Sequence, residues 1–120
     1  FCKWVEDVLV DVINMTKEKM EKYYDEHVTD TMCRNELYKK YYMDTIIEDT
    51  SAVAGLELIR RIVGMANVKD ITTIADEAKR ARAEKICITA AIDFIKNRSD
   101  KKCGKCFLKT LKDAIAEVDA

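Results

Sequence analysis

Residues 71–97 read ITTIADEAKRARAEKICITAAIDFIKN, and this stretch decides the fold class of the chain. Its apolar residues recur at steps of three and four, the spacing of one face of an α-helix. They are Ile71, Ile74, Ala75, Ala78, Ala81, Ile88, Ile92 and Ile95. Asp70 precedes them as an N-cap, so the pattern predicts a helix of about 27 residues, roughly 40 Å long.

Four more helices are predicted around this one. The first covers about Cys2–His27, where apolar residues repeat at helical spacing. The second covers about Thr31–Ile47, and the polar stretch Glu48–Ser51 predicts a break before a third helix that ends within Gly64–Asn67. Ser99–Asp100 predicts the cap of a last helix. Its inner face carries Cys103, Phe107, Leu111, Ala114, Ile115 and Val118.

The composition indicates an all-α fold and a single helical domain over residues 1–120. The chain has no proline and only three glycines, and the frequent turns of an all-β fold need those residue types. Lys and Arg number 21 against 22 for Asp and Glu, so the net charge offers no field that would attract nucleic acid or an anionic membrane. No apolar run approaches the ~18–20 residues of a membrane span.

Cysteine usage predicts a secreted, extracellular protein. Five cysteines in 120 residues are many for a cytosolic helical protein and ordinary for a secreted one. Two glycosylation sequons, which begin at Asn14 and Asn97, favour the same interpretation. The chain begins without Met or a signal-like stretch, which we interpret as prior removal of a signal peptide or as a fragment.

The cysteines are predicted to form structural disulfides that stabilise the bundle. In a helical hairpin that turns near residues 97–99, Cys87 and Cys106 lie at similar distances from the turn, which favours a Cys87–Cys106 bridge. A Cys33–Cys103 bridge becomes possible if the two hairpins pack with those ends together, and Cys2 is then the odd thiol. Other pairings of five cysteines stay open. Each bridge would add ~2–4 kcal/mol of stability.

Catalytic and metal chemistry is not expected. Cys103-Gly104-Lys105-Cys106 has the spacing of a dithiol redox site, but such sites usually follow a β-strand, and no strand pattern precedes Ser99. A zinc site built from these cysteines with Cys33, Cys87 or His27 would lack a second two-cysteine pair. The chain contains no Gly-rich phosphate loop, Gly-x-Ser-x-Gly or His-Glu-x-x-His motif. We therefore expect a protein that is not an enzyme and has no cofactor.

Two sets of surface residues are candidates for partner binding. Tyrosines mixed with charged residues flank one helix turn, and amphipathic tyrosines are favoured anchors in interfaces. Lysines at four-residue steps on the last helix could meet an acidic partner. The candidates are Tyr38, Tyr41, Tyr42, Lys101, Lys105, Lys109 and Lys112. The alternatives are that the tyrosines rim the bundle core and that the lysines form a solvated face.

The proline-free helical body, Cys33, Cys87 and the C-terminal run Cys103–Lys109 together resemble a family of small secreted proteins. This is the anopheline mosquito salivary family of helical, disulfide-bonded inhibitors, of the anophensin and albicin type. The resemblance implies binding to a host plasma protein, either the alternative complement convertase or contact-pathway coagulation factors. The fifth cysteine departs from a fully paired pattern. The resemblance transfers no site residues and does not define an oligomeric state.

A carrier of a lipid or other small apolar ligand is the alternative function. Residues 2–8 faintly resemble the first helix of saposin-like domains, which are helical and tied by disulfides. The six-cysteine pattern of that family is not met, because this chain has five cysteines.

Overall fold

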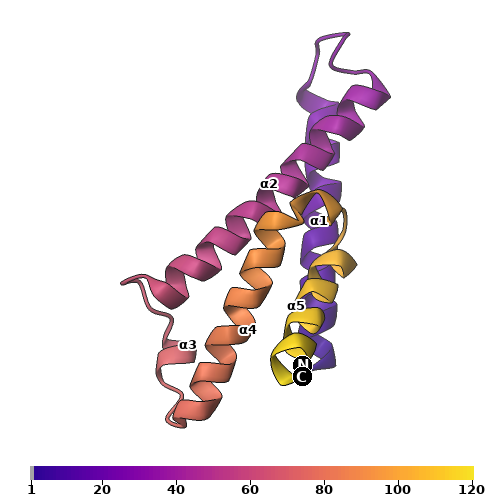
Figure 1. The fold of residues 1–120 in the computed structure, drawn as a ribbon. Helices are drawn as coiled ribbons and strands as arrows, with labels where there is room; N and C mark the ends of the chain where they lie inside the picture. Colours follow the sequence, from indigo (N-terminus) through magenta and orange to yellow (C-terminus); the bar gives the residue numbers. More distant parts are fainter. Residues whose placement is uncertain (1) are drawn as a thin grey trace.

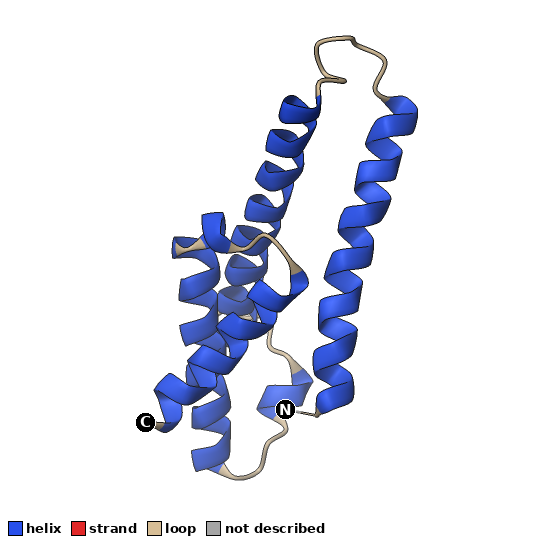
Figure 2. Ribbon diagram, turned by 90° about the vertical axis from the view of Figure 1, so that its right-hand side faces the viewer, coloured by secondary structure: helices blue, strands red, loops and turns tan. Residues whose placement is uncertain are grey.

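The computed structural model describes residues 2–120, and these residues form an all-α fold without strands (Figure 1 and Figure 2). Four long helices make up the body of the molecule. In chain order the elements are α1 (Lys3–His27), α2 (Glu36–Val63), α3 (Lys69–Thr72), α4 (Glu77–Lys96), the 3-10 turn η1 (Arg98–Asp100) and α5 (Gly104–Asp119). The predicted fold class is confirmed. None of the described helices is both long enough and apolar enough to cross a bilayer.

Helix α2 is continuous where the sequence predicted a break. The residues interpreted as a cap, Thr50 and Ser51, lie in the middle of the helix. The Thr50 hydroxyl donates back to the Ile46 carbonyl at 2.7 Å, and the Ser51 hydroxyl donates across to the Phe94 carbonyl of α4 at 2.8 Å. Both hydroxyls bond to carbonyl oxygens, so neither acts as an N-cap that accepts from a backbone amide. The observed N-cap is Asn35, whose side chain accepts from the Leu37 amide.

The predicted helix over residues 71–97 is divided in two. The Thr72 and Thr73 hydroxyls donate to the carbonyls four residues earlier, and the chain leaves helical geometry after Thr73. The next helix starts at Glu77 because Asp76, rather than Asp70, is its N-cap: the Asp76 carboxylate accepts from the Lys79 amide at 3.1 Å.

Neighbouring helices in the bundle are mostly not neighbours in the sequence. Helix α2 packs mainly on α4, α4 on α5, and α5 on α1, whereas the consecutive helices α1 and α2 contact each other little. The loop of residues 28–35 joins α1 to α2 at one end of the molecule (Figure 1 and Figure 2). The described chain is elongated, with extents of 57 × 30 × 23 Å. This arrangement leaves space between α1 and α2 for the candidate site.

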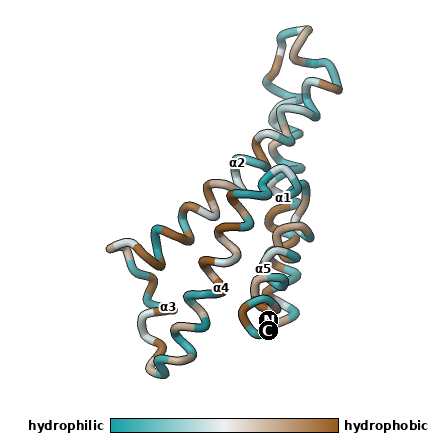
Figure 3. Tube along the Cα trace, viewed as in Figure 1, coloured by the Kyte–Doolittle hydropathy of each residue, from teal (hydrophilic) through white to brown (hydrophobic). Residues whose placement is uncertain are grey.

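The core lies where α2, α4 and α5 meet. Its buried residues are Ile47, Ala90, Phe94, Phe107 and Ala114. The Phe94 and Phe107 rings lie 5.4 Å apart between centroids and are tilted by 37°, a favoured aromatic geometry. Apolar residues recur along these three helices (Figure 3). Full burial of an Ile or Phe side chain is worth about 1.5–3 kcal/mol, so the three large residues of this cluster are a main source of stability.

Two glycines allow helices to approach closely. A Cβ atom at Gly55 of α2 would lie 2.6 Å from the Ala91 carbonyl oxygen of α4. A Cβ atom at Gly104 of α5 would lie 2.5 Å from the Val10 carbonyl oxygen of α1. Real Cβ atoms do not come this close to backbone oxygen, so each crossing depends on the missing side chain.

The predicted disulfides are not formed, and all five cysteines are free. Cys106 lies four residues before Thr110, which bonds to Asp93, whereas Cys87 lies six residues before Asp93 on the antiparallel helix α4. The two cysteines are therefore displaced in opposite directions, by about 15 Å along the bundle. The prediction failed because η1 and residues 101–103 lengthen the connection between α4 and α5.

The structure also separates Cys33 from Cys103. Cys33 contacts Tyr24 at the end of α1, while Gly104, next to Cys103, contacts Asn14. Ten residues of α1 separate these contacts, about 15 Å along the axis, whereas a disulfide needs Cα atoms roughly 4.4–6.8 Å apart. The helical fold is thus held by packing rather than by the predicted bridges.

Candidate functional site

The main candidate site is an apolar groove between α1 and α2 near the loop that joins them. Its volume is about 690 Å³, and most of its lining is apolar or aromatic. The Tyr24 and Tyr42 ring centroids lie 5.6 Å apart, and the Tyr38 and Tyr42 rings stack at 6.5 Å. Met20 and Ile46 add aliphatic surface. The groove could receive an aromatic or aliphatic group.

Tyr24 is a buried residue in the lining of this groove. Its hydroxyl donates to the Cys33 carbonyl of the α1–α2 loop. Burial raises the pKa of the Tyr24 phenol, and the neighbouring Cys33 and tyrosines add to the rise. The phenol therefore stays protonated at neutral pH and keeps the loop attached to α1.

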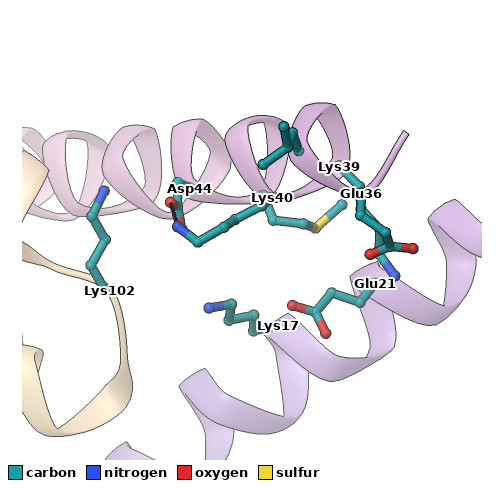
Figure 4. Close-up of a pocket in the computed structure, with 9 residues that line it drawn as sticks. Lys17, Glu21, Glu36, Lys39, Lys40, Asp44 and Lys102 are labelled. Atoms are coloured by element: carbon teal, nitrogen blue, oxygen red, sulfur yellow. Dashed lines mark hydrogen bonds and ion pairs between the residues drawn. The ribbon is translucent and has the colours of Figure 1, made fainter. Parts of the chain in front are cut away.

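A second, polar groove of about 570 Å³ lies between α1 and α2 on the other side of Met43 (Figure 4). Lys17 and Glu21 enter it from α1, and Lys102 enters from the segment before α5. Most of its cations have carboxylate partners. The ion pairs are Lys39–Asp25 at 2.8 Å, Lys40–Asp44 at 3.0 Å and Lys102–Glu48 at 2.7 Å. Because the charges are paired, this groove is a weak candidate for binding a free anion.

The tyrosines predicted as partner-binding residues do cluster on α2. Tyr41 is 67% exposed, and Tyr38 and Tyr42 are 44% and 43% exposed. Tyr38 and Tyr42 also line the groove, so the same side chains form both its wall and its outer surface. All three tyrosines are therefore exposed, and their role in partner binding stays a prediction.

The predicted lysine stripe is not a single free surface. Lys101 precedes α5, is buried, and pairs with Asp93 at 2.5 Å. Lys109 pairs with Asp113 at 2.6 Å, and Lys112 pairs with Glu6 of α1 at 2.9 Å. Lys105 is exposed. The structure therefore assigns Lys101 and Lys112 to contacts between elements.

A polar cluster around Asp93 was missed by sequence reasoning. The Asp93 carboxylate accepts from Lys101 Nζ at 2.5 Å, Asn97 Nδ2 at 2.5 Å and Thr110 Oγ1 at 2.7 Å. Although burial opposes the shift, these hydrogen bonds lower the pKa of Asp93 to about 2. The sequence feature that could have indicated this cluster is Asp93 itself, an acidic residue within the apolar run near the end of α4. Asn97 belongs to a predicted sequon, and its amide is committed to this cluster.

Two further titratable side chains with defined neighbours are Glu57, within α2, and His27, at the end of α1. Glu57 accepts from Arg60 Nη2 at 2.7 Å and from Arg61 Nε at 2.5 Å, and these hydrogen bonds lower its pKa to about 2. His27 is exposed at the end of α1, where its ring stacks on Tyr23 with centroids 3.9 Å apart.

Among residues 2–120, no three metal-ligating side chains come together.

The two cysteines of the Cys-x-x-Cys motif lie together at the start of α5. Cys103 is the N-cap residue, and its Sγ lies 3.2 Å from Cys106 Sγ. Burial opposes ionisation of Cys106, but hydrogen bonds from Cys103 and from nearby backbone amides give a net lowering of the Cys106 pKa. Burial raises the pKa of Cys87 on α4. The motif therefore forms a dithiol in which the Cys106 pKa is shifted in the opposite direction from that of Cys87.

Sequence comparison finds partial similarity to one enzyme. The chain is 27% identical over 110 residues to methylthioribose kinase 1 of Oryza sativa subsp. japonica, which covers 80% of this chain and 25% of the relative. It is 29% identical over 90 residues to methylthioribose kinase of Bacillus pumilus, covering 75% and 23%. Over 57 residues it is 39% identical to methylthioribose kinase of Bacillus cereus, covering 48% and 14%.

The chain thus spans a quarter or less of the length of these relatives. No family model matches the chain, and no solved structure matches it. The comparisons do not test the resemblance to salivary inhibitors, which stays a prediction.

Proposed function

We propose that this chain is a helical part of a longer small-molecule kinase related to methylthioribose kinase. The observation that carries the proposal is the sequence similarity to methylthioribose kinases. The rice relative matches over 80% of this chain, and a bacterial relative matches over 75%. A kinase transfers a phosphoryl group from a nucleoside triphosphate, and the protein contributes mainly positioning and charge. The 120 residues hold no Gly-rich phosphate loop. In this proposal, nucleotide binding belongs to residues outside them.

Apolar side chains on α1 and α2 support the same proposal. On α1, Trp4 is 70% exposed and Val12 is 55% exposed. Val53 and Leu56 of α2 are similarly exposed. Exposed apolar faces of this kind mark surfaces that another structure covers. In this proposal, the rest of the longer kinase covers these exposed apolar side chains.

The test is an activity assay on the full-length protein that contains these residues. With methylthioribose and ATP, the proposal expects ADP release that depends on methylthioribose, together with a phosphorylated sugar detected by mass spectrometry. Ribose in place of methylthioribose is the substrate control. ATP turnover that is absent, or that does not depend on methylthioribose, would contradict the proposal.

A second candidate function is protein binding through the exposed tyrosines, and the secreted salivary-type inhibitor belongs to this class. The supporting observation is Tyr41, which is 67% exposed beside Tyr38 and Tyr42. Purified chain would be added to assays of alternative-pathway complement activity and of contact-activated clotting. The proposal expects inhibition that weakens in Tyr41→Ala and persists in Met65→Ala, since Met65 is exposed at the opposite end of α2. No inhibition at micromolar concentration would exclude it.

The apolar groove favours a third possibility, a carrier of a lipid or other small apolar ligand. Its volume of about 690 Å³ is in the range of small-molecule sites, and Tyr24, Tyr38 and Tyr42 supply aromatic walls. Organic extraction of the purified chain followed by mass spectrometry tests it. A carrier would yield a stoichiometric apolar compound that is lost in Met43→Lys, and an empty extract would argue against carriage.

A further inference from the structure

The Cys103–Cys106 pair is arranged for a reaction that neither the kinase proposal nor the predicted disulfides include. The two Sγ atoms lie 3.2 Å apart, whereas a disulfide bond measures about 2.05 Å. The sulfurs therefore need to approach by only about 1.2 Å. Cys103 has extended backbone geometry as the N-cap, and its carbonyl accepts from the Cys106 and Phe107 amides. Rotation of its side chain leaves these backbone bonds in place.

Both cysteines of the pair are partly exposed, and Cys106 is the one that lines a groove. Its side chain lines an open polar groove of about 240 Å³ between the end of α4 and the start of α5. Lys101 and Lys109 line the same groove, as do the carboxylates of Asp93, Asp100 and Asp113. Cys103 is not part of this lining. The arrangement places a thiol that lines the groove beside a second thiol that does not.

The start of α5 favours the thiolate form of Cys106. Cys106 is the third residue of the helix, where backbone amides without helical partners point toward the N-terminus. Cys103 can donate a hydrogen bond to the Cys106 sulfur. The backbone around it is fixed, because the Gly104 amide donates to Asn14 Oδ1 of α1 at 2.9 Å. Helix-terminal cysteines with such donors are the reactive ones in proteins.

We propose that Cys103 and Cys106 form a reversible dithiol–disulfide site that reacts with small-molecule disulfides such as oxidised glutathione. The Cys106 thiolate attacks one sulfur of the disulfide, forms a mixed disulfide and releases one thiolate. Cys103 loses its proton to solvent and attacks the Cys106 sulfur, which releases the second thiolate. The protein loses two electrons and two protons, and the small disulfide is reduced to two thiols.

Peptide mapping of the intact chain tests the site directly. The reduced protein is incubated with oxidised glutathione, quenched with an alkylating agent and digested with trypsin without reductant. Trypsin cleaves after Lys102, Lys105 and Lys109, so the two cysteines fall in separate peptides, 103–105 and 106–109. The proposal expects these peptides to be joined by a disulfide and to separate on addition of dithiothreitol.

Single substitutions distinguish the roles of the two thiols. Cys103→Ser is expected to stop the reaction at the mixed disulfide, so that one glutathione stays on Cys106. Cys106→Ser is expected to abolish the linked peptide and to leave Cys103 largely unmodified. Cys87→Ser, on α4, is the matched control and keeps the linked peptide. Circular dichroism confirms that each variant is folded.

The proposal is overturned if the wild-type chain gives no 103–105 to 106–109 linkage. It is also overturned if Cys106 links instead to Cys2, Cys33 or Cys87, because the structure brings only Cys103 to its sulfur. These outcomes do not depend on kinase activity, so the site can fail or succeed independently of the proposed function.

Discussion

Gly104 of α5 lies directly against the backbone of Val10 in α1, and a Cβ atom at Gly104 would come within 2.5 Å of the Val10 carbonyl oxygen. The Gly104 amide also donates to Asn14 one turn further along α1. Asn14 is the first residue of a predicted sequon, and here its side chain joins α1 to the start of α5. This crossing holds α1 to the rest of the bundle, because α1 makes few contacts with α2.

Gly104→Ala is expected to destabilise the fold because the added methyl group meets backbone rather than a side chain that could move. Overpacking of this kind costs about 1–3 kcal/mol. The measurement is urea denaturation followed by circular dichroism. Lys105→Ala is the control, since Lys105 is the next residue on α5 and is exposed. Equal stability of Gly104→Ala and Lys105→Ala would show that the crossing is not as close as described.

Ser51→Ala is expected to lower stability by about 1 kcal/mol, because it removes the buried hydrogen bond from Ser51 to the Phe94 carbonyl. Thr50→Ala is its matched control. The Thr50 hydroxyl bonds only within α2, to Ile46, and alanine favours helix, so that variant should be neutral or slightly stabilised. Thermal unfolding of the pair provides the comparison. A larger loss in Thr50→Ala than in Ser51→Ala would contradict the continuous α2 helix.

The hydrogen bonds of Asp93 predict that the free energy of unfolding depends on pH in the acidic range. The pKa of Asp93 is lowered in the folded state to about 2, from an ordinary value of 3.8. A lowered folded-state pKa stabilises the protein above the unfolded-state pKa, and the contribution is lost as the pH falls from about 4 toward 2. Asp93→Asn should therefore be less stable than wild type at pH 7, and the difference should shrink toward pH 2.

Urea titrations at several pH values between 7 and 2 measure this effect. Asp113→Asn, at an exposed ion pair on α5, controls for the loss of one negative charge. If the stability difference between wild type and Asp93→Asn is the same at pH 7 and pH 2, then the contacts of Asp93 with Lys101 and Thr110 do not stabilise the folded state.

The sequence predicts the helical class well because periodic apolar residues and the lack of proline leave few other folds. The limits of α1 were predicted to within a residue, since His27 is followed by residues that favour a turn. The break at Thr50 and Ser51 was wrong because hydroxyl residues suit both a cap and the middle of a helix. Only the position of Phe94 on a neighbouring helix decides between those roles.

The candidate site was less predictable, since it depends on the packing order of the helices. Tyr38 and Tyr42 were identified from their residue type, but the groove that they line exists because α1 and α2 diverge. Lys101 was assigned to a surface stripe from its spacing, and only the tertiary structure shows that it is buried against Asp93. The disulfide predictions failed for the same reason, because helix register cannot be read from the spacing of cysteines alone.

The central proposal, that these residues belong to a longer kinase, is tested most directly by sequencing the complete open reading frame that encodes them. The aligned part of the chain covers 25% of the rice relative, so the account predicts a protein about four times as long, with a Gly-rich phosphate loop outside residues 1–120. An open reading frame that consists of a signal peptide followed only by these 120 residues would contradict the account and favour the secreted inhibitor.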